Sequence, residues 1–255
     1  MKLQAYFQPA DFERALDSFA AARLDWPLRA RYELYRLATV AFNDNVAEPE
    51  RRTAVAAIYD QLVRNWGLLR GYPRTSCWNA DQVFDTLVGC QRFGRARGVD
   101  LVNIDVAQNF TLILECVRRF DGIKPMTGDF PHMASSKLMH FFNPHLFPIY
   151  DRAEIWDNVC RRAFKREYDQ FCNRHGFAIF ERTSRFNVYY LSWASEIMKT
   201  VDPAIGTIFA AWFARHSGVD VNDVVVGDCD HYWAAMFEIA AIGAAHIEMT
   251  KAQEK

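Results

Sequence analysis

Residues 120–156 read FDGIKPMTGDFPHMASSKLMHFFNPHLFPIYDRAEIW, and this run carries the clearest fold signal in the chain. Gly122, Pro125 and Gly128 end a preceding helix, because glycine adopts backbone angles that other residues avoid and proline lacks an N–H. Pro131 suits the first turn of a second helix. Apolar residues then recur at helical spacing. They are Met133, Ala134, Leu138, Met139, Phe141 and Phe142.

The end of this run predicts a third helix. Asn143-Pro144 ends the second helix at residue 142, and residues 146–149 (Leu-Phe-Pro-Ile) form an extended apolar turn. Asp151 follows this turn, and an aspartate there is a good N-cap for a helix that begins at Arg152. We therefore expect a helix, a hairpin, a helix, an extended turn and an aspartate at the start of the next helix.

Two parts of the run resemble the helix-hairpin-helix DNA glycosylases. Residues 128–135 (GDFPHMAS) are similar to the hairpin of that superfamily, usually written G-[VI]-G-x-[KQ]-x-A. Residues 147–151 (FPIYD) are similar to the segment that delivers its catalytic aspartate to a helix start. Asp151 lies 19 residues after His132, close to the spacing in such enzymes. The resemblance covers residues 103–165.

The resemblance implies an all-α fold of two closely packed helical subdomains with a cleft between them. Residues 1–255 would form a single compact helical unit that contains the hairpin and the catalytic segment. The sequence departs from the family pattern at two positions. Phe130 replaces the second hairpin glycine, and His132 stands where the bifunctional members have their lysine.

A hairpin of this kind binds a DNA phosphate through outward N–H groups and the positive end of the second helix. Gly128 and the start of the 131–142 helix would do this here. Phe130 makes a close approach of the backbone harder, and Lys124 and Lys137 are nearby cations that could compensate. The alternative is an ordinary connection between two helices.

Asp151 is the expected catalytic residue. Cleavage of an N-glycosidic bond builds positive charge on the sugar, and a carboxylate stabilises that charge and positions the attacking water. The alternative is that Asp151 only caps a helix, and the two roles are compatible. Histidine is a poor Schiff-base nucleophile, so His132 predicts hydrolysis without lyase activity, with a contact to phosphate or sugar. Two alternatives stay open. His132 is merely exposed, or the protein has lyase activity that uses Lys124 or Lys137.

Residues 66–79 (WGLLRGYPRTSCWN) interleave aromatic residues with arginines, as in segments that stack on bases and pair with phosphates. A glycosylase must also extrude its target base, so we expect Trp66, Tyr72 and Trp78 to supply the pocket or the wedge. Arg70 and Arg74, with Arg152 after the catalytic aspartate, are the further expected DNA contacts. The alternative is a loop that covers the core. Two further aromatic runs, 186–193 and 231–233, are also candidates for the pocket.

Composition limits the other possibilities. The chain has 255 residues, 51% hydrophobic and 15% aromatic, which excludes a disordered protein. It contains no apolar run long enough for a membrane span and no signal peptide, so a cytoplasmic protein is expected. The six cysteines are scattered without a CxxC pair, which indicates no metal site and no cofactor. The net charge is −1, with a basic middle (64–97) and an acidic end (202–248).

The rest of the chain is also predicted to be helical. Residues 177–181 and 224–226 are the only strand-like runs, and neither makes a sheet. The expected helices outside residues 120–156 are 9–23, 28–42, 48–66, 80–95, 103 or 105 to 120, 152–175, 184–200, 203–216 and 229–248.

The sequence therefore predicts a monomeric, monofunctional DNA glycosylase that acts on double-stranded DNA and leaves an abasic site. Its base is not defined, and a bulky modified base in phage DNA is one hypothesis, which would make the protein a defence enzyme. The main alternative is a non-catalytic helix-hairpin-helix module that binds DNA or a partner. A different all-α enzyme or nucleotide-handling protein also stays open.

Overall fold

The structure is a computed structural model that describes residues 2–22, 28–69, 72–88, 96, 98–123, 131–179, 185–226 and 231–254. Every regular element within these residues is a helix, which confirms the all-α prediction. The elements are α1 (Lys2–Ala5), α2 (Pro9–Ala22), α3 (Leu28–Ala41), α4 (Glu48–Asn65), the 3₁₀-helix η1 (Arg74–Ser76), α5 (Ala80–Val88), α7 (Val106–Arg118), α8 (Pro131–Phe142), the π-helix η2 (Arg152–Ala163), α9 (Lys165–His175), α10 (Arg185–Met198), α11 (Ala204–Ser217), α12 (Val221–Val226) and α13 (Trp233–Gln253).

Local signals place several helix ends. The carboxylate of Asp105 accepts a hydrogen bond from the N–H of Gln108 at 3.1 Å and caps α7. Gly176 ends α9 with φ of 65°, a left-handed conformation that glycine adopts without steric cost. Residue 105 was one of the two predicted starts of α7, and residue 175 was the predicted end of the helix that stops before Gly176.

The structure differs from the sequence reading at two places. Residues 224–226 belong to the helix α12, because Asp220 starts a helical turn by accepting the N–H of Asn222 at 2.8 Å and Val224 is fully buried. Packing of this kind overrides the strand preference of valine. The predicted helix over 152–175 is interrupted at Phe164, where η2 ends and α9 begins. Residues 177–179, the described part of the other strand-like run, contain no strand.

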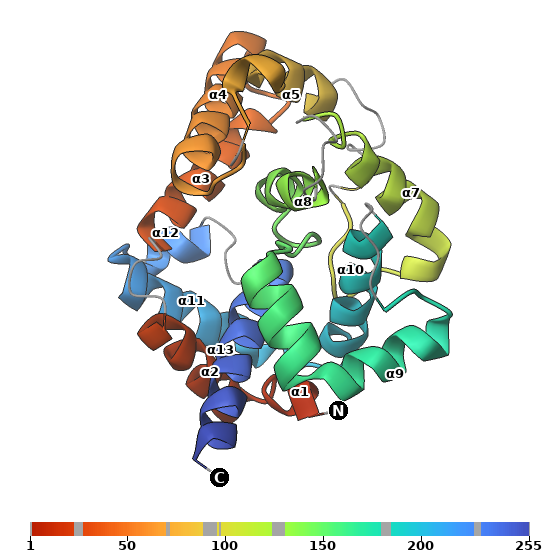
Figure 1. Ribbon diagram of the computed structural model, residues 1–255. Helices are drawn as coiled ribbons and strands as arrows, with labels where there is room; N and C mark the ends of the chain where they lie inside the picture. Colours follow the sequence, from red (N-terminus) through yellow and green to blue (C-terminus); the bar gives the residue numbers. More distant parts are fainter. Residues whose placement is uncertain are drawn as a thin grey trace.

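The helix α13 is the central element of the lower half of the molecule (Figure 1). It is buried on all sides over most of its length, from Trp233 to Ala245. The helices α2 and η2 pack against it. Gly243 allows α2 to approach closely, because a Cβ atom there would lie 1.8 Å from the carbonyl oxygen of Ala15 in α2.

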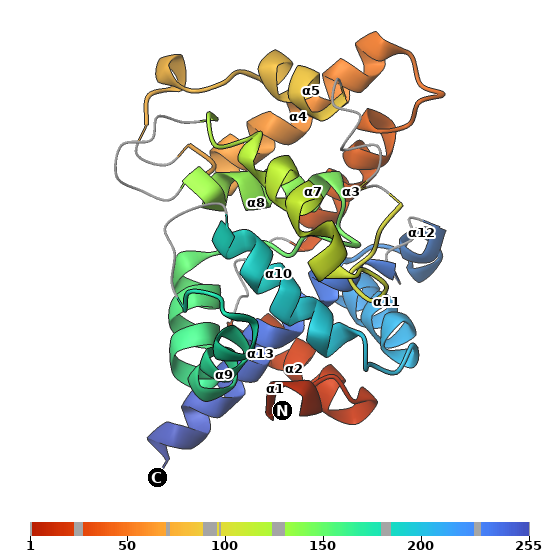
Figure 2. The same ribbon diagram turned by 90° about the vertical axis from the view of Figure 1, so that its right-hand side faces the viewer.

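The helices α4 and α5 form a layer at the opposite end from α2 and α13, and α8 lies between the two groups (Figures 1 and 2). The helix α8 contacts α3, α7 and α10 and buries Leu138, Met139 and Phe141. It therefore sits at the centre of the fold, and the segment that leads to Asp151 leaves from its end. Within the described residues, no helix is both long and apolar enough to cross a bilayer.

Candidate functional site around Asp151

The segment that follows α8 is held by a buried asparagine. The side chain of Asn143 is 2% exposed, and its Nδ2 donates to the carbonyl oxygens of Ala96 at 2.7 Å and Val99 at 3.2 Å. Its Oδ1 accepts the N–H of His145 at 3.0 Å. Asn143 therefore ends α8 and ties the next turn to Ala96 and Val99.

Side chains also satisfy the backbone of residues 147–150, which lie outside any regular element. His140 in α8 lies 2.8 Å, through Nδ1, from the carbonyl oxygen of Phe147. The hydroxyl of Ser136 accepts the N–H of Tyr150 at 3.0 Å and lies 3.2 Å from the carbonyl oxygen of the same residue. The backbone of Ile149 lies near the carboxyl group of Glu238 in α13 and lowers its pKa. Because buried backbone groups need partners, these contacts fix the path of the chain just before Asp151.

Glu238 forms a buried ion pair with Arg31 of α3. The Nη2 atom of Arg31 donates to Oε1 of Glu238 at 3.0 Å, and both side chains are 1% exposed. Burial raises the pKa of Glu238, and the charge and hydrogen bond of Arg31 act in the opposite direction. The guanidinium of Arg31 also lies 5.1 Å from the ring centroid of Trp66, within cation–π range.

His140 is neutral in this environment. Burial and the nearby Arg31 charge lower its pKa well below the ordinary value. A carbonyl oxygen can only accept, so Nδ1 of His140 carries the proton and donates to Phe147. The Nε2 atom then accepts from the hydroxyl of Tyr35 at 2.7 Å. Arg31, Tyr35, His140 and Glu238 thus form one buried polar group beneath the segment 147–150.

Asp151 lies at the start of η2, as predicted, and caps it. Its Oδ1 accepts the N–H groups of Ala153 at 2.9 Å and Glu154 at 3.1 Å. Both bonds use the same oxygen, and the residue is only partly buried. The carboxylate is therefore held by one oxygen at the end of a segment whose backbone is fixed. Its catalytic role stays a prediction.

The helix that Asp151 caps is a π-helix. The N–H of Trp156 donates to the carbonyl oxygen of Asp151 at 3.1 Å, and that of Phe164 donates to Val159 at 3.0 Å, both five residues apart. Such π-helical turns are rare in proteins, and those that occur are often found at functional sites.

A carboxylate and a histidine beside Asp151 were not expected from the sequence. Oε2 of Glu154 lies 3.4 Å from Nε2 of His246 and 3.2 Å from Nδ2 of Asn158. The side chains of Glu154 and His246 are 14% and 27% exposed. The two residues are 92 positions apart on η2 and α13, so no local pattern could have paired them.

Several of the predicted DNA contacts lie outside the residues that the structure describes. Lys124, Gly128, Phe130 and Arg70 lie outside the described residues, as does the side chain of His132. Arg152 is exposed directly after Asp151.

The remaining predicted cations have protein partners. The Nζ atom of Lys137 donates to the carbonyl oxygen of Trp66, so this side chain also ties α8 to the turn after α4. Arg74 has a side chain that is 60% exposed and lies 3.5 Å from the carboxylate of Asp60.

The predicted wedge residues are partly buried. Trp66 packs edge-on against Phe141, with ring centroids 5.4 Å apart, and so lies above the Arg31–Glu238 pair. The backbone N–H of Trp78 donates to the carbonyl oxygen of Ile123 at 3.0 Å. Trp66 is therefore connected to the Asp151 segment through Arg31 and Glu238, whereas Trp78 packs on residues 120–123. Tyr72 is partly buried.

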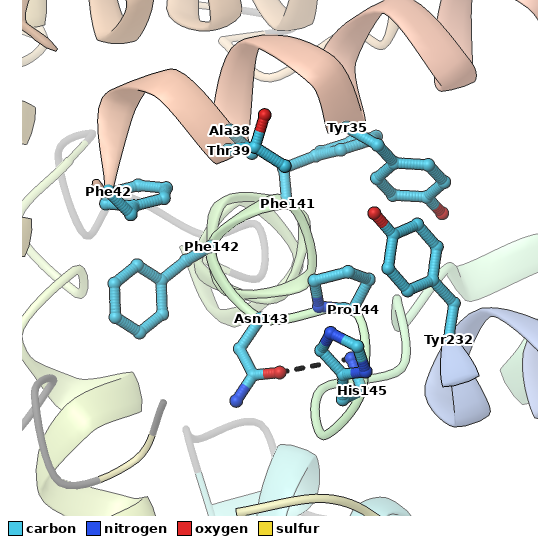
Figure 3. Close-up of a pocket in the computed structure, with 10 residues that line it drawn as sticks. All are labelled: Tyr35, Ala38, Thr39, Phe42, Phe141, Phe142, Asn143, Pro144, His145 and Tyr232. Atoms are coloured by element: carbon cyan, nitrogen blue, oxygen red, sulfur yellow. Dashed lines mark hydrogen bonds between the residues drawn. The ribbon is translucent and has the colours of Figure 1, made fainter. Parts of the chain in front are cut away.

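An aromatic pocket of about 220 Å³ lies between α3 and the end of α8 (Figure 3). Figure 3 shows Phe42 and Phe142 on one side and Tyr35 and Tyr232 on the other. Asp151 does not line this pocket. Tyr232, from one of the two predicted aromatic runs, does line it, whereas Tyr190 and Trp193 of the other run are fully buried.

Comparison of the chain with protein-family models, with curated proteins and with solved structures found no match in any of the three.

Proposed function

We propose that the protein is a monofunctional DNA glycosylase that hydrolyses an N-glycosidic bond in double-stranded DNA and leaves an abasic site. The observation that carries this proposal is the carboxylate of Asp151, partly exposed at the start of η2 and held there by Oδ1. A carboxylate at a fixed position can stabilise the positive charge that develops on the sugar and orient the attacking water.

The construction of residues 147–151 supports this role. A catalytic group must be held in position by its surroundings, because small displacements cost much of the rate. Ser136 and His140 each bond the backbone within four residues of Asp151. Such support is more than a helix cap requires, since an N-cap residue needs only its own side chain.

The test is mass spectrometry of bases released from normal, damaged and phage-modified DNA. We expect one class of base to appear with wild-type protein and to disappear with Asp151→Asn, while DNA binding persists. An abasic product without a borohydride-trapped adduct would agree with hydrolysis. Release of a base by the Asp151→Asn variant at the wild-type rate would contradict the assignment of Asp151. A bulky modified base of phage DNA is the substrate to test first for a role in defence.

A non-catalytic DNA-binding module is the second candidate. It is favoured by the use of Asp151 as an N-cap, which alone would explain an aspartate at this position. This candidate predicts DNA binding by wild-type protein with no base released from any of the substrates.

A further inference from the structure

Along η2 and α9, the positively charged side chains are more exposed to solvent than the negatively charged ones. Over residues 152–174 every lysine and arginine is exposed, and every aspartate and glutamate is partly buried. The side chains of Arg161 and Lys165 are 61% and 59% exposed, against 14% for Glu154. We call the exposed cations the basic edge. They are Arg152, Arg161, Arg162, Lys165, Arg166 and Arg174.

Two of the acids in this stretch are turned toward the rest of the fold. Glu167 accepts the backbone N–H groups of Lys2 at 2.5 Å and Leu3 at 3.1 Å, at the start of α1. Glu154 contacts His246 of α13. These two carboxylates therefore contact other elements, whereas Asp157 and Asp169 pair with Arg161 and Lys165 of the edge. The six cations outnumber the four acids of the stretch, although the whole chain has a net charge of −1.

Arg162 and Arg166 are the least neutralised members. Among the described residues, no carboxylate lies within ion-pair distance of either, and Arg162 contacts only the amide oxygen of Asn158, at 3.4 Å. Some exposed arginines elsewhere are neutralised by carboxylates. Arg52 contacts Glu48, Asp81 and Asp85.

We propose that the basic edge binds the phosphate backbone of duplex DNA and leads it to Asp151. Arginine fits phosphate because its planar guanidinium donates two parallel hydrogen bonds. The edge begins at Arg152, directly after Asp151, and continues along η2 and α9, which follow one another on the same side of the molecule (Figure 1). It differs from the predicted contacts of the hairpin and of residues 66–79, and it rests on the proposed function only for the choice of DNA.

The test measures the affinity of the full chain for a fluorescent duplex of unmodified sequence by anisotropy, between about 50 and 200 mM salt. Each lost phosphate contact lowers the slope of log K against log salt by about 1. For the double variant Arg162→Ala/Arg166→Ala we therefore expect the magnitude of this slope to be smaller by about 2. The variant should also bind the duplex more weakly.

The matched control is Arg14→Ala/Arg215→Ala. Both arginines have side chains that are 56% exposed, and both contact carboxylates in or beside α2. This variant should keep the wild-type slope, although it removes the same formal charge. Absence of DNA binding by wild-type protein, an unchanged slope in the edge variant, or an equal loss in both variants would overturn the inference.

The same samples separate this inference from the proposed function. A reduced slope in the edge variant, together with no base release by wild-type protein, would support the basic edge and contradict the glycosylase. Base release by wild-type protein, together with an unchanged slope in the edge variant, would support the glycosylase. It would also mean that the DNA binds at a different surface. Thermal unfolding of both variants checks that the substitutions leave the fold intact.

Discussion

Arg31 and Glu238 are 207 residues apart in the chain, yet they form an ion pair of 3.0 Å with both side chains 1% exposed. The pair joins α3 to α13, and the backbone of Ile149 lies near the same carboxyl group and lowers its pKa. Two helices and the segment that ends in Asp151 therefore meet at one carboxylate. Any change that moves Glu238 is expected to move the proposed catalytic residue as well.

Removal of one partner should be costly, because the other charge is then buried without compensation. We expect Glu238→Met to lower the free energy of unfolding by about 3–5 kcal/mol. The double variant Arg31→Met/Glu238→Met should recover part of this loss, since apolar residues of similar size pack where the pair was. Urea denaturation of both variants measures this. An equal or greater loss in the double variant would contradict it.

Gly243→Ala should be strongly destabilising. The new Cβ would lie 1.8 Å from the carbonyl oxygen of Ala15, so α2 and α13 would have to separate. We expect a loss above about 3 kcal/mol, the upper end of typical overpacking. Gly98→Ala is the control, because nothing lies within 4 Å of its Cβ position. Thermal unfolding that shows similar midpoints for the two variants would contradict the close crossing of these helices.

Glu248 should make stability depend on pH. Burial raises the pKa of this carboxyl, but hydrogen bonds from Lys2, Tyr6 and Lys251 outweigh it and lower the pKa from 4.5 to about 2. Because the folded pKa lies below the unfolded one, the stabilisation is present above pH 4.5 and is lost as the pH falls toward 2. The free energy of unfolding, measured from pH 4.5 toward pH 2, should fall less steeply in Glu248→Gln than in wild type.

Two substitutions at Asp151 separate the helix cap from catalysis. Asparagine also caps helices, so Asp151→Asn should keep the stability of the wild-type protein, whereas Asp151→Ala should lose about 1 kcal/mol. Both variants should lose base release, because neither has a carboxylate. Denaturation and base release are measured on the same preparations. Full activity in Asp151→Asn would leave the cap as the only role of Asp151.

Local rules were sufficient for much of the fold. Apolar spacing predicted α2, α3, α4 and α8 to within a residue or two of their observed ends. Asp151 was predicted to cap a helix, residue 105 was one of two predicted starts of α7, and residue 175 was the predicted end of α9, because capping depends on a few neighbouring residues. The same rules failed for residues 224–226, where the burial of Val224 decided in favour of a helix.

The surroundings of Asp151 could not be predicted in this way. Arg31 lies between Arg29 and Arg36 in the sequence, and nothing nearby distinguishes it from those two surface residues, yet it is buried. Glu238 is one of two acids, with Glu248, in the largely apolar helix α13.

The sequence by itself determined that the chain is helical, where most of the described helices lie and which aspartate caps η2, because spacing and capping act over one or two turns. The tertiary structure alone decided that Glu238 meets Arg31 and Ile149, that Glu154 meets His246 and that the cations of η2 and α9 stay outside. Those contacts depend on how distant helices pack, and each buried charge takes its partner from whichever helix is packed against it.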